Sequence, residues 1–355
     1  MIAADMAVQR PPNAKLLVVD ASRRIGHAPR ADFVKLLRRG DLVIANDAAT
    51  LPASLQGVHA ATGATLEVRL AGRPSLEPED VGRFSAVVFG EGDFRTRTED
   101  RPAPPPLAAG DRLTLGPLRA TVERLLDHTR LVSLLFDGTP DEVWAGLARH
   151  GRPIQYAHVN TPLALWDVWT RIAGPPVAFE PPSAGFALDW HALAAMRERG
   201  AEFETITHAA GISSTGDEDL DRLLPFDEPY RISEAAAHAV SRARARGGRV
   251  VAVGTSVVRA LEHAATGDGD VRAGEGLATQ HIGRSSCLRV VDALLSGTHE
   301  PGTSHYELLR AFLDDATLQR TSAELEAGGY RTHEFGDSVL IERVRPQAGI
   351  INLMI

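Results

Sequence analysis

The chain has 355 residues, with 38 lysines and arginines against 46 aspartates and glutamates, and a formal net charge of −8. Its 44% hydrophobic and 24% charged residues exclude a disordered chain, and its length is that of about two domains. The single cysteine, Cys287, excludes an intrachain disulfide and a cysteine-based metal cage. Since apolar runs are shorter than the roughly 18 residues of a membrane span and no secretion segment opens the chain, we expect a cytoplasmic protein without membrane contact.

The N-terminal part of the chain predicts two buried strands with a helix between them. Leu16–Asp20 and Asp41–Asp47 are short apolar runs rich in Val and Ile, bounded by polar residues. The segment DFVKLLRRG carries apolar residues at helical spacing and ends at Gly40, a suitable C-terminal cap.

From about Gly57 to Gly138 the pattern changes to short alternating segments and tight turns. TLEVRL alternates with period two, and RPAPPPLAAGD fits neither a strand interior nor a helix. This texture favours a small all-β barrel or sandwich. Because both flanks have an α/β pattern, we predict an α/β core domain of residues 1–56 and 139–355, with an inserted small all-β, barrel-like domain at 57–138.

Capped helices alternate with apolar strands in the remainder of the chain. Thr139 to Glu142 form a capping box with Pro140 at the first helical position. Ser233 is expected to cap a helix that precedes a buried strand at Arg249–Val253. Ser304, with an acid three residues on, is expected to open a later helix. This order predicts a core sheet covered by helices.

The most informative local feature is the turn Gly254-Thr255-Ser256, which joins a strand to a helix that carries Arg259 one turn on. Free backbone N–H groups, two hydroxyls and the positive end of the helix dipole suit an anion such as a carboxylate. An ordinary hydroxyl-capped connection explains the same residues. The glycines of a dinucleotide-binding fingerprint are missing.

Further candidates are single residues in loops. Ser183, Ala184 and Gly185 are small residues that permit close approach of a ligand, although a plain loop fits equally. His208 and His299 lie in polar segments, where each is either structural or a general base. Histidines and carboxylates lack metal-ligand spacing, so no metal is expected.

Seven segments, in order along about 300 residues, resemble the S-adenosylmethionine:tRNA ribosyltransferase-isomerase family of queuosine biosynthesis. The strongest is RGGRVVAVGTSVVRALE, similar to the family's RGxRVIAVGTTSVRxLE. The other six are GDLVIANDAATLPASL, PPSAGF, ITHAAGISS, FDEPYRIS, LRVVDALLSGTHEPGTS and YRTHEFGDSVLI. The family's β-rich insertion also falls where the pattern places one.

The resemblance implies transfer and isomerisation of the ribosyl group of S-adenosylmethionine onto 7-aminomethyl-7-deazaguanine in the tRNA anticodon. Epoxyqueuosine, methionine and adenine are the products, and S-adenosylmethionine is a consumed co-substrate. We expect Thr255, Ser256 and Arg259 to hold a carboxylate or phosphate, and His208 or His299 to act as base, with Glu228 on a ribose hydroxyl. The expected substrate-binding residues are Asn46, Asp47, Ser183, Ala184, Gly185, Tyr230, Gly254, Thr255, Ser256, Arg259, Pro301, Ser304 and Asp337.

Departures from the family pattern leave the acceptor open. Two family arginines are replaced by Ala49 and Ser54, and each lost arginine weakens phosphate binding. A paralogue acting on a small molecule, or a binding protein without activity, is therefore an alternative. Two basic clusters remain, which are either tRNA contacts or solvated helix surface: Lys35, Arg38 and Arg39, and Arg242, Arg244 and Arg246. We expect the protein to be a monomer or a weak homo-oligomer.

Overall fold

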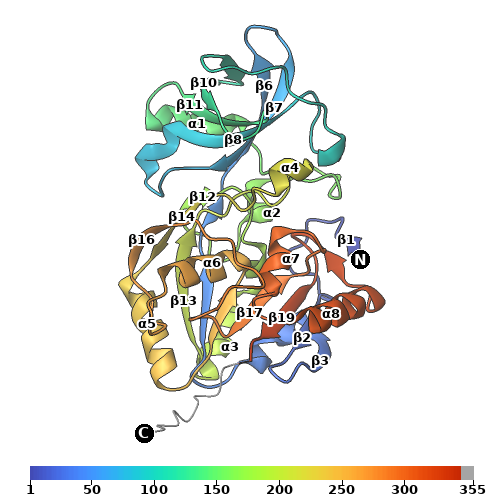
Figure 1. Ribbon diagram of the computed structural model, residues 1–355, viewed down its shortest axis with the longest axis vertical. Helices are drawn as coiled ribbons and strands as arrows, with labels where there is room; N and C mark the ends of the chain where they lie inside the picture. Colours follow the sequence, from blue (N-terminus) through green and yellow to red (C-terminus); the bar gives the residue numbers. More distant parts are fainter. Residues whose placement is uncertain (345–355) are drawn as a thin grey trace.

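The computed structural model describes residues 1–344, and Figure 1 shows its two parts along the long axis. One part is a closed six-stranded barrel, and the other is a nine-stranded sheet covered by helices. The predicted fold class, an α/β core with an inserted barrel-like β domain, is confirmed. The boundaries at 57 and 138 stay a proposal, and residues 345–355 of the core range lie outside the described residues.

The barrel is antiparallel throughout and closes through the pairing of β6 with β9. In β10, Leu118, Ala120 and Val122 are buried while Arg119 between them is exposed, which is the alternation that the sequence displays. Its strands are β6 (Ser54–His59), β7 (Thr65–Gly72), β8 (Arg83–Phe89), β9 (Arg112–Leu115), β10 (Leu118–Leu125) and β11 (Leu131–Phe136). Two short 3₁₀ helices, Pro78–Gly82 and Thr98–Asp100, lie in its connections.

The core sheet has the order β16-β14-β13-β4-β15-β17-β19-β2-β3. Its four central strands, from β13 to β17, are parallel, so their carboxyl ends meet at one edge. The strands are β2 (Lys15–Val19), β3 (Ile25–Pro29), β4 (Leu42–Asn46), β13 (Glu202–His208), β14 (Glu228–Ile232), β15 (Val250–Val253), β16 (Gly274–Ala278), β17 (Ala293–Gly297) and β19 (Ser338–Glu342).

Helices bury both faces of this sheet because the central strands are apolar on both sides. Ala252 of β15 packs in the cluster that contains α5 (Glu234–Ala245), α6 (Thr255–Ala264), α7 (Ser304–Leu309) and α8 (Asp315–Ala327). Val251 packs on the opposite side with α3 (Trp190–Glu198), η1 (Arg30–Leu36) and η4 (Ser183–Ala187).

The remaining elements are α1 (Pro140–His150), α2 (Leu165–Val168) and α4 (Glu218–Asp221), together with the pairs β1 (Ile2–Ala3) with β18 (Arg331–Thr332) and β5 (Ala49–Thr50) with β12 (Pro176–Ala178). No helix within residues 1–344 combines the length and the apolar character needed to cross a bilayer.

The helix starts agree with the sequence in two cases and differ in one. The capping box is confirmed, since Glu142 N–H donates to Thr139 Oγ1 (3.4 Å) and Thr139 N–H donates to Glu142 Oε2 (2.8 Å). Ser233 caps α5 by accepting from the amide of Ala236 (3.1 Å). The cap of α7 is Thr303 rather than Ser304, because the hydroxyl of Thr303 receives the amide of Tyr306 (3.2 Å).

The expected helix through DFVKLLRRG is only the 3₁₀ helix η1, which ends at Leu36. Its continuation is prevented because Arg38 N–H donates to Asp41 Oδ2 (2.8 Å) instead of to a helical carbonyl. Lys35, Arg38 and Arg39 therefore do not share a helical face, and the prediction that they lie on one helix is wrong.

Asp41 belongs to a buried charge network at the amino-terminal edge of the parallel strands. Arg249 contacts both of its carboxylate oxygens from Nε (3.2 and 3.1 Å) and also pairs with Glu342. Arg38 reaches Glu342 Oε2 (2.9 Å), and Arg249 Nη2 donates to the carbonyl of Leu36 (3.0 Å). The network joins η1, β4, β15 and β19 at the edge opposite the carboxyl ends.

Replacing Arg249 by methionine is expected to lower the free energy of unfolding by ~3–5 kcal/mol, because it leaves the buried Asp41 without its cation. The matched control is Arg24→Met, which removes a guanidinium 2.8 Å from the carboxylate of Asp20 at an exposed site and is expected to cost ~0.5 kcal/mol. Chemical denaturation measures both, and equal losses would contradict the role of the network.

Candidate functional site

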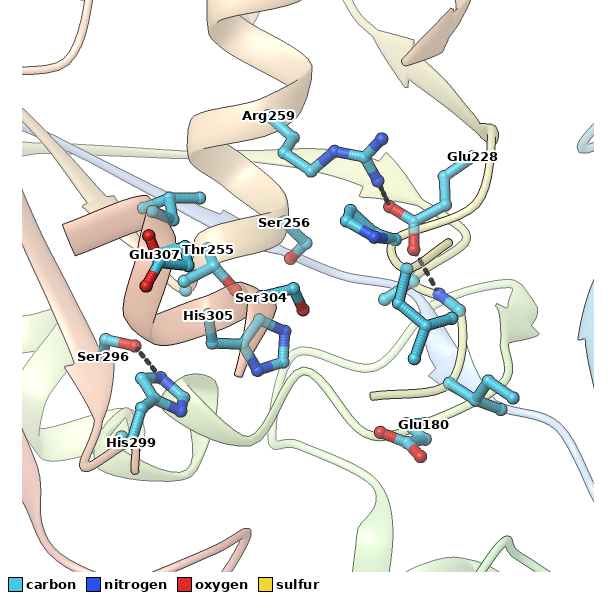
Figure 2. Close-up of a pocket in the computed structure, with 18 of the residues that line it drawn as sticks. Glu180, Glu228, Thr255, Ser256, Arg259, Ser296, His299, Ser304, His305 and Glu307 are labelled. Carbon is cyan, nitrogen blue, oxygen red and sulfur yellow. Dashed lines mark hydrogen bonds and ion pairs between the residues drawn. The ribbon is translucent and has the colours of Figure 1, made fainter. Parts of the chain in front are cut away.

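A cavity of about 310 Å³ opens at the carboxyl ends of β13, β15 and β17. Its walls are the first turns of α6 and α7, the loop after β13, and the segment from Glu180 to Ala184. Figure 2 shows these side chains converging from separate elements. The carboxyl end of parallel strands is where open α/β sheets bind ligands.

The α6 turn that the sequence singles out forms one wall. Gly254 has φ +99°, a conformation that other residues rarely adopt, and its place as N-cap leaves the first turn without a side-chain cap. Thr255 and Ser256 follow at the start of the helix and line the cavity. The amide of Asn46 lies 3.4 Å from Ser256 Oγ. Uncapped N–H groups and two hydroxyls suit the carboxylate of a ligand.

Arg259 also lines the cavity, but its guanidinium is engaged within the chain. Nε donates to the carbonyl of Gln280 (3.2 Å), and Nη2 donates to the carbonyls of Ala278 (2.9 Å) and Phe226 (3.2 Å). Nη1 donates to Phe226 (3.3 Å) and forms an ion pair with Glu228. Its five N–H groups therefore have partners, and the expected direct bond from Arg259 to a ligand anion is not what this geometry provides.

Glu228 is the centre of this arrangement. Its Oε1 accepts the amide of Gly211 (2.5 Å), while Oε2 faces Arg259 and His208 Nε2 (3.3 Å), as Figure 2 shows for the first two contacts. Burial raises the pKa of Glu228, and Arg259 opposes that rise. The ion pair thus connects α6, β14 and the loop after β13 around the cavity floor.

His208 does not line the cavity. It is fully buried, and burial together with the charge of Arg259 lowers its pKa to about 3. Its ring stacks on Tyr230, with centroids 6.5 Å apart. A neutral imidazole behind Glu228 is a packing partner, so the expectation that His208 is the general base has no support from its position.

His299 does line the cavity and is joined there by His305, which the sequence analysis missed. Nε2 of His299 lies 2.7 Å from Ser296 Oγ, and the two imidazole centroids are 4.8 Å apart. Burial holds the pKa of His299 well below its usual range, with His305 adding to the effect. Burial and the charge of Arg259 lower the pKa of His305 to about 4. Both rings are neutral at neutral pH.

Of the other predicted residues, Ser183, Ala184 and Ser304 line the cavity. Gly185 does not, because it packs in η4 against Thr170. Pro301 is exposed in the turn that precedes α7.

Four further predicted residues form hydrogen bonds within the chain and lie outside the cavity lining. Asn46 Oδ1 accepts the amide of His208 (3.0 Å) and its Nδ2 donates to that residue's carbonyl (2.9 Å). Asp47 accepts the hydroxyls of two β13 threonines (2.8 and 2.7 Å). Tyr230 bonds His263 Nδ1 (2.9 Å), and Asp337 accepts the amides of residues 15 and 331 (2.6 and 2.8 Å). None of the four lines the cavity.

Glu180 is the most consequential residue that the sequence analysis missed. It lines the cavity, and its Oε1 accepts the phenol hydroxyl of Tyr156. Burial and the neighbouring charge of Glu334 raise the pKa of Glu180 to about 7. An acid directly before the small-residue loop Pro181–Phe186 was the available signal. The cavity therefore holds a carboxyl group that exchanges a proton near neutral pH.

A second cavity, a groove of about 490 Å³, separates the barrel from the core. Arg73, Arg83 and Arg124 of the barrel line it, together with Asp127 and Asp227. Pro225 and His281 line both the groove and the first cavity, so the two adjoin.

The second predicted basic cluster is engaged elsewhere. Arg242 and Arg246 pair with Glu202 (3.0 and 2.5 Å), and Arg244 donates to the carbonyl of Arg289 (2.9 Å). Within residues 1–344, no group of three or more His, Cys, Asp or Glu side chains is placed to hold a metal ion.

The family model described as queuosine biosynthesis protein matches residues 1–341. An S-adenosylmethionine:tRNA ribosyltransferase-isomerase of Sorangium cellulosum is 35% identical over 369 residues, 96% of this chain and 96% of its own. The enzyme of that name from Gloeobacter violaceus is 33% identical over 93% of this chain and 89% of its own.

The fold has a solved counterpart. The crystal structure of S-adenosylmethionine tRNA ribosyltransferase from Thermotoga maritima matches with a TM-score of 0.50 and 20% identity, covering 96% of both chains. Since the relatives named above match over nearly their whole length, the alternative of a paralogue with a small-molecule acceptor is not favoured.

The Arg259–Glu228 pair is testable by a double-mutant cycle. Arg259→Met is expected to lower the free energy of unfolding by ~3–5 kcal/mol, because it leaves a buried carboxylate without its cation. Arg259→Met combined with Glu228→Gln is expected to lose less than the sum of the two single variants. Denaturation of the four proteins measures the coupling, and strictly additive losses would show that the pair does not act as a unit.

Proposed function

Because the chain belongs to the queuosine biosynthesis protein family, we propose that it is an S-adenosylmethionine:tRNA ribosyltransferase-isomerase. It transfers and isomerises the ribosyl group of S-adenosylmethionine onto a 7-aminomethyl-7-deazaguanine base in tRNA, and it releases methionine and adenine. The observation that carries the proposal is the match of relatives with this name over nearly the whole chain. A tRNA substrate implies a cytoplasmic location. That the protein is a monomer or a weak homo-oligomer stays a prediction.

The first cavity fits S-adenosylmethionine in charge. Asp221 and Glu307 line it and favour a ligand that carries a sulfonium and an ammonium group. The start of α6, with Thr255 and Ser256, offers N–H groups and hydroxyls to the methionine carboxylate.

The sulfonium makes methionine a good leaving group and acidifies the adjacent 5′ carbon, so the reaction needs groups that orient the substrate and move protons. The Arg259–Glu228 pair keeps the cavity floor rigid and positions Gly211. Ser183 and Ala184, on the loop before α3, are placed to pack against the adenosine.

The groove supplies the approach for the tRNA anticodon. Its three arginines, all from the barrel, provide positive charge beside the first cavity, and the shared residues Pro225 and His281 mark where the modified base enters. Arg83 is already bidentate with Glu123 (2.8 Å for both contacts), whereas Arg124 offers its charge at the groove. This arrangement replaces the basic clusters expected from the sequence.

The direct test of the activity is adenine release. Adenine is expected only when S-adenosylmethionine is combined with tRNA that carries the aminomethyl precursor base, and not with S-adenosylmethionine alone. Unmodified tRNA is the matched control. Release of adenine with small amines but not with the precursor tRNA would refute tRNA as the acceptor.

The groove is tested by the salt dependence of tRNA binding. Arg124→Gln is expected to reduce the slope of log affinity against log salt by about 0.7, the value for one phosphate of a single strand. Arg119→Gln removes the same charge from an exposed position of β10 outside the groove-lining residues, and it is expected to keep the slope. Equal slopes for the two variants would place the tRNA elsewhere.

A further inference from the structure

We propose that Glu180 is the catalytic residue that carries protons between the substrates in this cavity, an inference that rests on the proposed function. Its carboxylate accepts the proton that the acceptor amine loses as the new nitrogen–carbon bond forms. The resulting carboxylic acid gives a proton to adenine, which takes the electron pair of its breaking bond to the ribose carbon. The carboxylate is thereby regenerated. The bond between sulfur and the 5′ carbon breaks as the ring oxygen of the ribose closes the epoxide on that carbon, so sulfur takes the electron pair of the broken bond and leaves as the thioether of methionine. The proton that the 5′ carbon loses during the isomerisation goes to solvent.

The position of Glu180 separates it from the other acids of the cavity. Glu228 is paired with Arg259, Glu307 Oε2 with Arg310 Nε (2.9 Å), and Asp221 accepts the amide and hydroxyl of Thr215 (2.6 Å each). Within residues 1–344 Glu180 forms no ion pair, and Figure 2 shows its carboxylate beside the cavity without a bond to the other drawn residues. Its charge is therefore free to change.

Tyr156 provides a bond for either protonation state. The phenol oxygen contacts Glu180 Oε1 and lies 3.1 Å from the carbonyl oxygen of Ser214, although the phenol has only one proton to donate. When Glu180 is ionised, the phenol donates to the carboxylate. When Glu180 is protonated, the carboxyl donates to the phenol oxygen, and the phenol donates to Ser214. The pair thus accommodates gain and loss of a proton without leaving a buried donor unpaired.

The surroundings set the range in which the group titrates. Burial and the negative charge of Glu334 disfavour the carboxylate, and Glu334 is itself held by His158 Nε2 (3.2 Å). Hydrogen bonds from the phenol of Tyr156 and from the hydroxyl and amide of Ser213 favour the carboxylate. Arg69 of β7, which lies 5.6 Å from the centroid of the phenol ring, adds positive charge nearby. Across the cavity the charged or titratable side chains are Asp221, Arg222, Glu228, Arg259, His281, His299, His305 and Glu307.

His299 and His305 are poor candidates for the same task. Burial keeps the pKa of His299 and that of His305 low, so both rings stay unprotonated throughout the neutral range. A group serves best as both base and acid when its pKa lies near the working pH. Burial raises the pKa of Glu180 to about 7, which meets that condition.

The kinetic test compares wild type with Glu180→Gln, which keeps the size of the side chain and an oxygen for the phenol. For Glu180→Gln we expect kcat to fall by about 10²–10⁴-fold. In the pH profile of kcat, the limb that reports a group titrating near pH 7 is expected to disappear. The affinity for S-adenosylmethionine, measured by calorimetry, is expected to stay unchanged. Glu180→Asp is expected to restore part of kcat and the limb. In Tyr156→Phe the limb is expected to move to higher pH, because the phenol bond that stabilises the carboxylate is lost.

A stability measurement tests the titration without activity. The pKa of Glu180 is raised above that of an unfolded glutamate, so the folded state binds more protons between about pH 4.5 and 7, and wild-type stability falls as pH rises through that window. Glu180→Gln cannot ionise, so its Tm relative to wild type is expected to increase from pH 5 to pH 8. The control Glu91→Gln changes an exposed acid in the loop after β8, and its Tm difference is expected to stay constant.

The outcomes separate this inference from the proposed function. If wild type releases no adenine with precursor tRNA, the proposed function fails, and the inference that rests on it falls too. If wild type is active and Glu180→Gln keeps kcat and the limb near pH 7, or its Tm difference is independent of pH, the role of Glu180 is refuted and the proposed function stands.

Discussion

The buried ion pair between Arg259 and Glu228 is the interaction on which the geometry of the site depends. It joins the helix after β15 to the first residue of β14, and Glu228 extends it to the amide of Gly211. Two buried charges are tolerated only when they satisfy one another and their remaining hydrogen bonds, which the carbonyls of Phe226, Ala278 and Gln280 accomplish here. Three loops at the carboxyl edge of the sheet are thereby held in one arrangement.

Around this floor, the polar side chains that only pack are different from the one that can exchange a proton. His208 is buried behind the cavity, and His299 and His305 are partly buried in its wall. All three are neutral, so they pack around the ligand site without adding charge. Glu180 has a phenol as partner in place of a cation and keeps a titratable proton. The barrel adds a groove with three arginines next to the cavity, which suits a reaction between a small cationic substrate and a polyanion.

Sequence patterns were sufficient for the fold class, because alternation, capping residues and buried strands are local signals. They also located the α6 turn, where Gly254 is required by its backbone conformation. They could not show that the guanidinium of Arg259 is paired with Glu228 and bonded to three carbonyls, since those partners are distant in the chain. Nor could they find His305, or a raised pKa at Glu180, because burial and neighbours set a pKa and only the fold supplies them.

The arrangement of the site is tested most directly by a crystal structure of the protein with S-adenosylhomocysteine, which lacks the reactive sulfonium. We expect its carboxylate at the start of α6, within about 3.5 Å of the hydroxyls of Thr255 or Ser256. The ribose is expected beside Glu180, with the side chain of Arg259 still paired to Glu228. A ligand bound in the groove of the barrel, or one whose carboxylate displaces Glu228 from Arg259, would contradict it.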